Sequence, residues 1–339
     1  MTTFFVRQSG GNDTNDGLSF ANGWATIQFA ADTAVAGDIV LIASDGTHTP
    51  TASVDIDTNA GTAAAGPVTF RGAGSAGEDD GTVATISGSS LPATTDLFTF
   101  VIDYTKWENL RFTAATRHNL FDNNTSIGNV FVNCRFDNAA EEGCSYLAVG
   151  FAQFFNCEFD NNGGNGCGTD DLSSNRAGQI RAFNCSFHDN GENGIQSSDG
   201  GLILLHCLFY DNTNHGLLIN RDLESSGGSI IGNCVFNGNT SGILMSGSLI
   251  GIFFGSVYNC VFSNNSSHGV NFGSAHIDGH VDYNLYYLNT TAHRANFPTG
   301  ANDIEDDNPD FTSITDGSED FTPATGSPLL DAATPLKTA

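Results

Sequence analysis

The sequence predicts an all-β chain wound as a single-stranded, right-handed parallel β-helix, a solenoid with a short helix capping its N-terminal end. Three observations predict this fold. A phrase of the form Asn/His-Cys-x-Phe recurs along the chain, and successive cysteines are 23, 28, 22, 27 and 26 residues apart. A glycine and then an apolar residue follow each of these cysteines at an almost constant distance. Gly, Asn, Asp, Ser and Thr fill the gaps between short apolar runs, which is turn chemistry repeated many times.

Each phrase is expected to form a strand, followed by a turn that needs glycine and then by another strand. Alternate residues of a strand point to opposite faces. Val132, Cys134 and Phe136 are therefore expected on one inward face, with Arg135 on the other. The period suits one coil of a solenoid that carries its inserts in the turns. The phrase begins at Asn133, Asn156, Asn184, His206, Asn233 and Asn259.

The eight cysteines are expected to be free thiols inside the solenoid. Six stack in one inward row, and Cys144 and Cys167 stack in another. Side chains that project in parallel from neighbouring coils are poorly aimed for a disulfide. A structural zinc site would need paired close spacings such as Cys-x-x-Cys, which the sequence lacks. We therefore interpret these residues as small buried hydrophobes.

An asparagine-rich turn follows the phenylalanine of most coils. Asparagine tolerates left-handed backbone and can hydrogen-bond neighbouring turns through its amide. The sequence therefore predicts stacked amides, as in the asparagine ladders of parallel sheets. The residues concerned are Asn161, Asn162, Asn190, Asn212, Asn239, Asn264 and Asn265.

The two ends of the chain differ from the repeats. Residues 1–50 are expected to form an N-terminal cap, in which a helix over residues 24–31 covers an otherwise open sheet edge. Residues 51–290 are expected to form the coils. Residues 291–339 are expected to form an irregular C-terminal cap, because terminal repeats of solenoids are atypical.

The end segments carry a resemblance to a known family. The opening residues 5–19, 24–28 and 37–38, and the closing residues 308–311 and 326–332, are similar to those of pectate-lyase-like right-handed β-helix proteins. With the repeated phrase, the resemblance covers nearly the whole chain. It implies the fold. It leaves the function open, because this fold carries lyases, hydrolases, epimerases, adhesins and phage tailspikes.

The charge of the chain limits its partners. With 38 acidic and 11 basic residues, the net charge is -27, which repels nucleic-acid phosphates and anionic membrane surfaces. No nucleic-acid partner and no membrane insertion are expected, since no apolar run approaches the ~20 residues of a membrane span. Residues 1–7 lack a signal-peptide pattern. Synthesis in the cytoplasm is expected, followed by a virion or extracellular location after assembly or lysis.

One set of residues could carry catalysis. Asp171, Asp199 and Arg221 each lie fourteen residues after the cysteine of successive coils, so they are expected to stack at one edge of the solenoid. Neighbouring carboxylates would be ~5 Å apart, near the separation in retaining glycosidases. Alternatively, the pair could hold Ca²⁺ beside an arginine that acts as base or charge stabiliser. An ordinary exposed charge ladder is the third interpretation. The neighbours proposed to bind glycan are Asp170, Asn220 and Asp222.

A second set could bind a metal. His276, Asp278 and His280 alternate along an expected strand and share one face, where imidazole and carboxylate could bind a transition metal. An ordinary polar outer face is the alternative. Apart from Ca²⁺ at the aspartate pair, no cofactor is expected.

The sequence leaves three functions open. The first is a non-enzymatic structural protein of a virus particle or surface assembly, such as a phage tail, spike or capsid decoration, that contacts host polysaccharide. Its partners would be other virion proteins or itself, a homotrimer being one arrangement. This hypothesis comes first because no catalytic set is complete. The alternative is a polysaccharide lyase or glycoside hydrolase acting on an acidic glycan. The third is a bacterial adhesin or exopolysaccharide-related protein.

Overall fold

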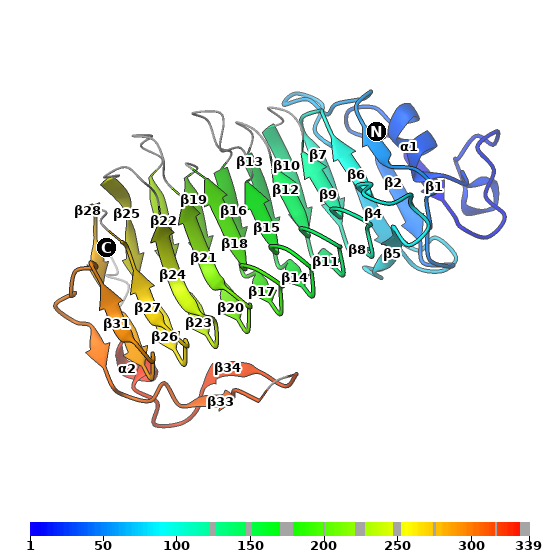
Figure 1. Cartoon of the computed structure of the whole chain (residues 1–339). Helices are drawn as coiled ribbons and strands as arrows, with labels where there is room; N and C mark the ends of the chain where they lie inside the picture. Colours follow the sequence, from blue (N-terminus) through cyan, green and yellow to red (C-terminus); the bar gives the residue numbers. More distant parts are fainter. Residues whose placement is uncertain are drawn as a thin grey trace.

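The computed structural model is a right-handed parallel β-helix, as the repeat predicts (Figure 1). It describes residues 1–122, 127–146, 151–169, 179–198, 201–220, 228–246, 252–273, 276–315 and 317–332. Each regular coil contributes one strand to each of three parallel sheets, here called A, B and C in the order in which the chain visits them. Consecutive coils therefore lie side by side along the rod, and residues at equivalent positions form rows.

The strands of each sheet follow one another along the rod axis. Sheet A contains β1 (Thr3–Val6), β2 (Ile39–Ala43), β4 (Val68–Ala73), β7 (Thr105–Glu108), β10 (Ile127–Val132), β13 (Phe151–Phe155), β16 (Gln179–Phe183), β19 (Leu202–Leu205), β22 (Ser229–Gly232), β25 (Ile252–Tyr258), β28 (His276–Asp278) and β29 (Val281–Asp282). Sheet B contains β5 (Ala84–Ser87), β8 (Leu110–Thr113), β11 (Arg135–Asp137), β14 (Glu158–Asp160), β17 (Ser186–His188), β20 (Leu208–Tyr210), β23 (Val235–Asn237), β26 (Val261–Ser263), β30 (Leu285–Tyr287) and β32 (Ile304–Glu305). Sheet C contains β3 (Val54–Ile56), β6 (Phe98–Phe100), β9 (Leu120–Asp122), β12 (Cys144–Tyr146), β15 (Cys167–Thr169), β18 (Ile195–Ser198), β21 (His215–Asn220), β24 (Ser241–Ser246), β27 (His268–Asn271) and β31 (Ala292–Ala295).

The repeated phrase spans the corner between sheets A and B. Its first residue adopts the left-handed conformation, with φ of 53° at Asn133, which asparagine tolerates better than most residues. Cys134 and Phe136 are buried as predicted. The prediction for Val132 is wrong, because Val132 is only half-buried and its neighbour Phe131 is the buried residue. The left-handed corner at Asn133 interrupts the alternation, so parity does not carry over from sheet A to sheet B.

Two rows fill the interior beside sheet B. The phenylalanine rings of the phrase stack nearly parallel, and successive centroids from Phe136 to Phe262 are 4.7–5.0 Å apart. All eight cysteines are buried and free. This result confirms the prediction that they serve as small core residues. Burial raises the pKa of the Cys157 thiol, which keeps it protonated and unreactive.

Most of the asparagines predicted after sheet B form a ladder, which is buried, and Asn289 joins it. Asn161 and Asn264 are outside the ladder, where they adopt the left-handed conformation and bond Asp160 and Asn237. Within the ladder, each side-chain amide donates to the amide oxygen of the next coil, at N–O distances of 2.8–3.4 Å. The ladder runs through Asn162, Asn190, Asn212, Asn239, Asn265 and Asn289. Because these residues lie in the turn that leads into sheet C, the ladder fixes where the strands of sheet C begin.

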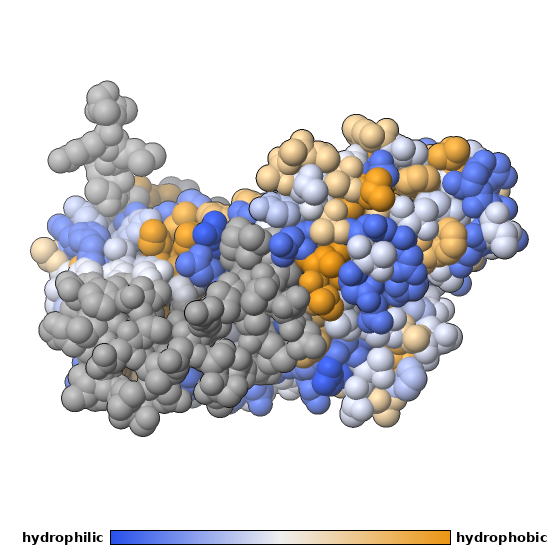
Figure 2. Space-filling view, turned by 90° about the horizontal axis from the view of Figure 1, so that it is seen from above, coloured by the Kyte–Doolittle hydropathy of each residue, from blue (hydrophilic) through white to orange (hydrophobic). Residues whose placement is uncertain are grey.

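The two ends of the rod differ, because the last segment lies along the side of sheet B. At the N-terminal end, η1 (Phe20–Asn22) is followed by α1 (Ile27–Thr33), and the side chain of Thr26 caps α1 by accepting a hydrogen bond from the backbone of Phe29 (Figure 1). At the other end, the antiparallel strands β33 (Phe311–Ser313) and β34 (Asp320–Pro323) lie along sheet B, and α2 (Leu329–Ala332) follows. Among the described residues, no helix is both long and apolar enough to span a bilayer. Seen from above, hydrophilic and hydrophobic residues are intermixed over the N-terminal part of the rod (Figure 2).

Candidate functional site

The predicted catalytic residues belong to segments that connect sheet C to sheet A. Asp171, Asp199 and Arg221 lie outside the described residues, so their stacking stays a prediction. The same is true of two of the proposed glycan-binding residues, Asp170 and Asp222.

The third proposed glycan-binding residue, Asn220, is the last residue of β21. It pairs in register with Ser198 of the preceding coil, which is the register that the repeat predicts. The Asn220 side chain accepts a hydrogen bond from Ser246 of the following coil. Polar side chains from consecutive coils therefore do meet at this edge of sheet C.

The predicted metal set is only partly described. His276 and Asp278 are the first and last residues of β28, but their side chains lie outside the described residues. His280 is exposed and lies just after that strand. The metal assignment for these residues stays a prediction.

The opposite edge of sheet C, where its strands begin, carries a row of polar side chains that the sequence analysis missed. We call it the polar row, and it contains His118, Glu142, Asn165, Asn193 and His215. Each member lies two residues before a buried residue of the following strand, and these buried residues pair in register from one coil to the next. Four members immediately precede the repeated glycine, so aligning the coils on glycine could have revealed most of the row.

The polar row borders the outer side of the solenoid, but His118, Glu142, Asn165 and Asn193 are themselves buried and His215 is half-buried. The His118 ring stacks on Phe121, with centroids 5.7 Å apart, and Phe121 is the outward residue of β9 between two buried ones. Gly168 occupies an outward position of β15, and a Cβ atom added there would lie 3.4 Å from Glu142 and 3.5 Å from Asn165. The row therefore borders the outer face of sheet C, and Asn220 lies at the far end of the same strands.

Hydrogen bonds connect the members of the row from coil to coil. Nδ2 of Asn165 donates to Oε1 of Glu142 at 3.3 Å, and Nδ2 of Asn193 donates to Oδ1 of Asn165 at 2.8 Å. The backbone N–H of His215 donates to Oδ1 of Asn193 at 3.1 Å. These bonds fix the side chains before any ligand arrives, which is the condition for a preorganised site.

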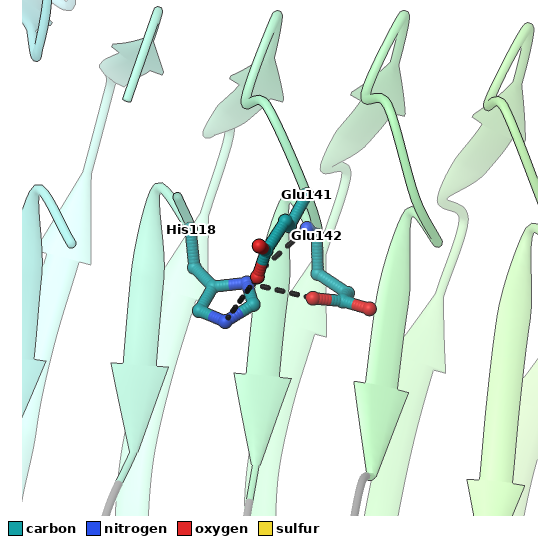
Figure 3. Close-up of side chains that lie close together, drawn as sticks. All are labelled: His118, Glu141 and Glu142. Carbon is teal, nitrogen blue, oxygen red and sulfur yellow. Dashed lines mark hydrogen bonds and ion pairs between the residues drawn. The ribbon is translucent and has the colours of Figure 1, made fainter. Parts of the chain in front are cut away.

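An acid–base cluster lies at one end of the row (Figure 3). Nδ1 of His118 is 2.7 Å from Oε2 of Glu142, and its Nε2 is 3.4 Å from Oε2 of Glu141. Burial raises the pKa of Glu142, but the hydrogen bond and charge of His118 lower it by more, so the net shift is downward. Glu142 is therefore a carboxylate at neutral pH. The adjacent Arg117 is paired with Asp96 by two hydrogen bonds.

His215, at the other end of the row, differs from His118 because no carboxylate contacts its ring among the described residues. Burial lowers the pKa of this imidazole, so the ring is neutral at pH 7. Its Nδ1 is buried and has no hydrogen-bond partner among the described residues. The Nε2 atom is the ring nitrogen that remains to face a ligand, and the neutral ring can accept a proton from one.

Sheet B carries another histidine–carboxylate cluster, formed by Glu158, Asp160 and His188. Its groups are already paired. Asp160 accepts two hydrogen bonds from Arg135 at 2.8 and 2.6 Å, and His188 contacts Glu158 and Asp189 through its two ring nitrogens. This cluster is an ion-pair network that joins coils, and it leaves no open group for a ligand.

Comparison with known proteins supports the fold. No protein-family model matches the chain, and the search of curated proteins finds no match. Pectate lyase Pel9A is 16% identical with a TM-score of 0.66, covering 100% of this chain and 93% of that one. A rhamnogalacturonan lyase is 14% identical with a TM-score of 0.59, covering 93% and 91%. A structure described as a glycoside hydrolase is 10% identical with a TM-score of 0.59, covering 90% and 96%. At these identities the likeness concerns architecture, and the chain has the right-handed parallel β-helix fold of pectate-lyase-like proteins.

Proposed function

We propose that this protein is a polysaccharide-cleaving enzyme, a lyase or a glycoside hydrolase, that binds an acidic glycan along the outer face of sheet C. The observation that carries the proposal is the polar row, whose hydrogen-bonded side chains include an imidazole–carboxylate pair and a neutral imidazole. Two lyases and a glycoside hydrolase among proteins of the same fold support an enzymatic role.

The shape of the row favours a polymeric ligand. Equivalent residues of neighbouring coils are ~4.8 Å apart, so the four steps from His118 to His215 extend over about 19 Å. Asn165 and Asn193 are 1% and 2% exposed and hydrogen-bond along the row, so the direct contacts to sugar units would come from the half-buried His215 and from the outward positions of sheet C that the row borders.

The chemistry of the face suits proton transfer. A neutral His215 can remove a proton near pH 7, and general base catalysis of this kind contributes about 10²–10⁴-fold in rate. Cleavage by elimination needs a base and a positive charge near the uronate carboxylate, whereas hydrolysis needs a proton donor and a second carboxylate. The predicted Asp171, Asp199 and Arg221 follow the far ends of these strands, and Asn220, next to Arg221, is about 17 Å from His215 along β21. They would therefore bind another part of the glycan, as a cation site or a carboxylate pair.

A cation is expected to assist binding of an acidic glycan. The net charge of -27 repels a polyanion at long range. Ca²⁺ held by the predicted pair Asp171 and Asp199 would reverse the local charge where the substrate carboxylate binds. Cleavage is therefore expected to require a divalent cation and to weaken in chelator.

The hypothesis of a structural virion protein predicts a different outcome. Nothing in the described residues or in the comparisons favours a virion role, so we place the enzymatic function first. A rod that only binds glycan would retain the ligand without cleaving it, which the following experiment detects.

The test is a panel of acidic polysaccharides, including pectate, rhamnogalacturonan and mannuronan, incubated with the full chain with and without Ca²⁺. Unsaturated ends, detected by ultraviolet absorbance, identify a lyase, and reducing ends without unsaturation identify a hydrolase. His215→Asn and Asp199→Ala are expected to lower the rate at least tenfold. His188→Asn is the matched control on sheet B and is expected to leave the rate unchanged. Absence of cleavage on every glycan, or an equal loss in the control, would overturn the proposal.

A further inference from the structure

We propose that His118 and Glu141 bind a divalent first-row transition metal ion, such as Zn²⁺, and that Glu142 orients the imidazole for this role. The site is separate from the predicted Ca²⁺ pair and does not depend on the proposed function. Its three side chains each offer a ligand atom, and these atoms all lie within 4.8 Å of one another.

Two consecutive coils build the site. His118 immediately precedes the turn into β9, and Glu142 occupies the equivalent position before β12, which pairs with β9 in register. Glu141 lies one residue earlier, where its backbone bonds Arg117. The separation of the three side chains is therefore fixed by sheet pairing. Figure 3 shows both carboxylates beside the imidazole, each joined by a dashed line to a different ring nitrogen.

Each ring nitrogen of His118 has a distinct environment. Nδ1 lies 2.7 Å from Oε2 of Glu142 and 3.2 Å from its backbone nitrogen, so Glu142 occupies this side of the ring. Nε2 faces Oε2 of Glu141 at 3.4 Å. A carboxylate that engages one nitrogen of a histidine and leaves the other for the metal is a common arrangement in metal sites.

Burial and charge also suit a cation. The side chains of His118 and Glu142 are 6% and 11% exposed, whereas Glu141 is 54% exposed and faces solvent. An ion can therefore reach Nε2 from the side of Glu141, while the other two groups stay fixed. Asn165 holds Glu142 by donating to its Oε1. The nearest cationic side chain, Arg117, is paired with Asp96 and does not occupy either glutamate.

The donor atoms select the class of metal. Ca²⁺ takes six to eight oxygen ligands, and this site offers one imidazole nitrogen and the two oxygens of Glu141. A nitrogen donor beside a carboxylate favours Zn²⁺ and its neighbours in the first transition row. The remaining positions would be filled by water or by an oxygen of a ligand on sheet C.

The cluster of Glu158, Asp160 and His188 is the natural contrast. There Arg135 lies 2.6 Å from Asp160 and 3.7 Å from Glu158, so a cation would have to displace a guanidinium. The same residue types thus occur on sheet B in a setting that disfavours metal, and they supply control variants.

The test measures Zn²⁺ binding to the untagged full chain in the absence of glycan. The protein is stripped with chelator, and affinity is obtained by competition with a chromophoric chelator. His118→Gln and Glu141→Gln are expected to abolish Zn²⁺ binding at this site, and Glu142→Gln is expected to weaken it about 10- to 100-fold. His188→Gln and Glu158→Gln are expected to bind as the unsubstituted protein does.

The exposed position of Glu141 keeps the test valid, since Glu141→Gln removes a ligand without disturbing the interior. Unfolding temperatures of all variants in chelator check that each is folded. Unchanged Zn²⁺ affinity in Glu141→Gln and His118→Gln, or an equal loss in His188→Gln, would overturn the proposal. Because no glycan is present, failure here and failure of polysaccharide cleavage are independent results.

Discussion

Replacing Asn212 by alanine should test how far the buried asparagine ladder supports the solenoid. Asn212 is 2% exposed. Its Nδ2 donates to the carbonyl of Phe187 and to Oδ1 of Asn239, both at 3.0 Å. Its Oδ1 accepts from the backbone nitrogen and from Nδ2 of Asn190, at 3.3 and 2.9 Å.

The cost of the substitution follows from the groups that it leaves unpaired. Without the Asn212 amide, the backbone N–H of Asn190 and one hydrogen of its Nδ2 lose their acceptor inside the protein. The other Nδ2 hydrogen of Asn190 still donates to the carbonyl of Phe159. Oδ1 of Asn239 still accepts a hydrogen bond from the backbone N–H of residue 212. A buried unsatisfied donor costs about 1–3 kcal/mol, so Asn212→Ala should lower the free energy of unfolding by about 2–5 kcal/mol.

The matched control is the exposed ladder at the corner between sheets A and B. Nδ2 of Asn156 donates to Asn133 at 3.1 Å in an exposed position, and its φ is 53°. Asn156→Gly removes that amide and keeps the left-handed backbone accessible, so a change within about 0.5 kcal/mol is expected. Guanidinium unfolding curves followed by circular dichroism measure both variants. A loss below about 1 kcal/mol in Asn212→Ala, or equal losses in the two variants, would refute this account of the buried amides.

Three further predictions concern the interior and the ion pairs. Phe209→Ala removes a ring stacked between two others, at 5.0 and 4.7 Å, and should cost about 3–5 kcal/mol of stability; a denaturant midpoint close to that of the unsubstituted protein would contradict it. A thiol reagent should leave the eight buried cysteines unmodified in the native protein and modify all of them in guanidinium; rapid native labelling would contradict their burial. Burial lowers the pKa of His188, but hydrogen bonds to Glu158 and Asp189 raise it by more, for a net upward shift. Because the pKa of His188 is higher in the folded chain than the value of about 6.5 in the unfolded chain, its ion pairs stabilise the fold fully at pH values below about 6.5. This stabilisation is lost as the pH rises through the pKa of His188 in the folded chain. His188→Gln should therefore destabilise the protein more at pH 5 than at pH 9, and the opposite order would contradict the assignment.

The buried residues of the solenoid could be predicted from the sequence because the same motif recurs in successive coils. Cys134 and Phe136 recur at fixed separation in each coil, and a residue type that recurs at one position of a solenoid occupies one row. The same pattern could not predict that Phe131, and not Val132, is the buried residue of β10. Period-2 alternation assumes a continuous strand, and the left-handed Asn133 turns the chain into another sheet.

The outer face was harder to predict for two physical reasons. The members of the polar row differ in residue type, so no repeated letter marks them, although most precede the repeated glycine. Asp171, Asp199 and Arg221 lie in connections of unequal length, where a fixed offset from the cysteine no longer fixes a position in space. Their partner Asn220 is still within a strand, and there the register prediction holds.

These two edges of sheet C differ in how the fold holds them. The buried ladder of Asn162 and its equivalents sits in the turn before sheet C, so the polar row inherits a spacing set by backbone pairing and by buried amides. His118 and Glu142 can therefore keep their mutual geometry without help from a ligand. We infer that the row supplies the reactive part of the site and that substrate preference depends on the residues that follow the strands of sheet C. Changes in the connections should then alter which glycan is bound, while changes in the row should alter whether the bound glycan reacts.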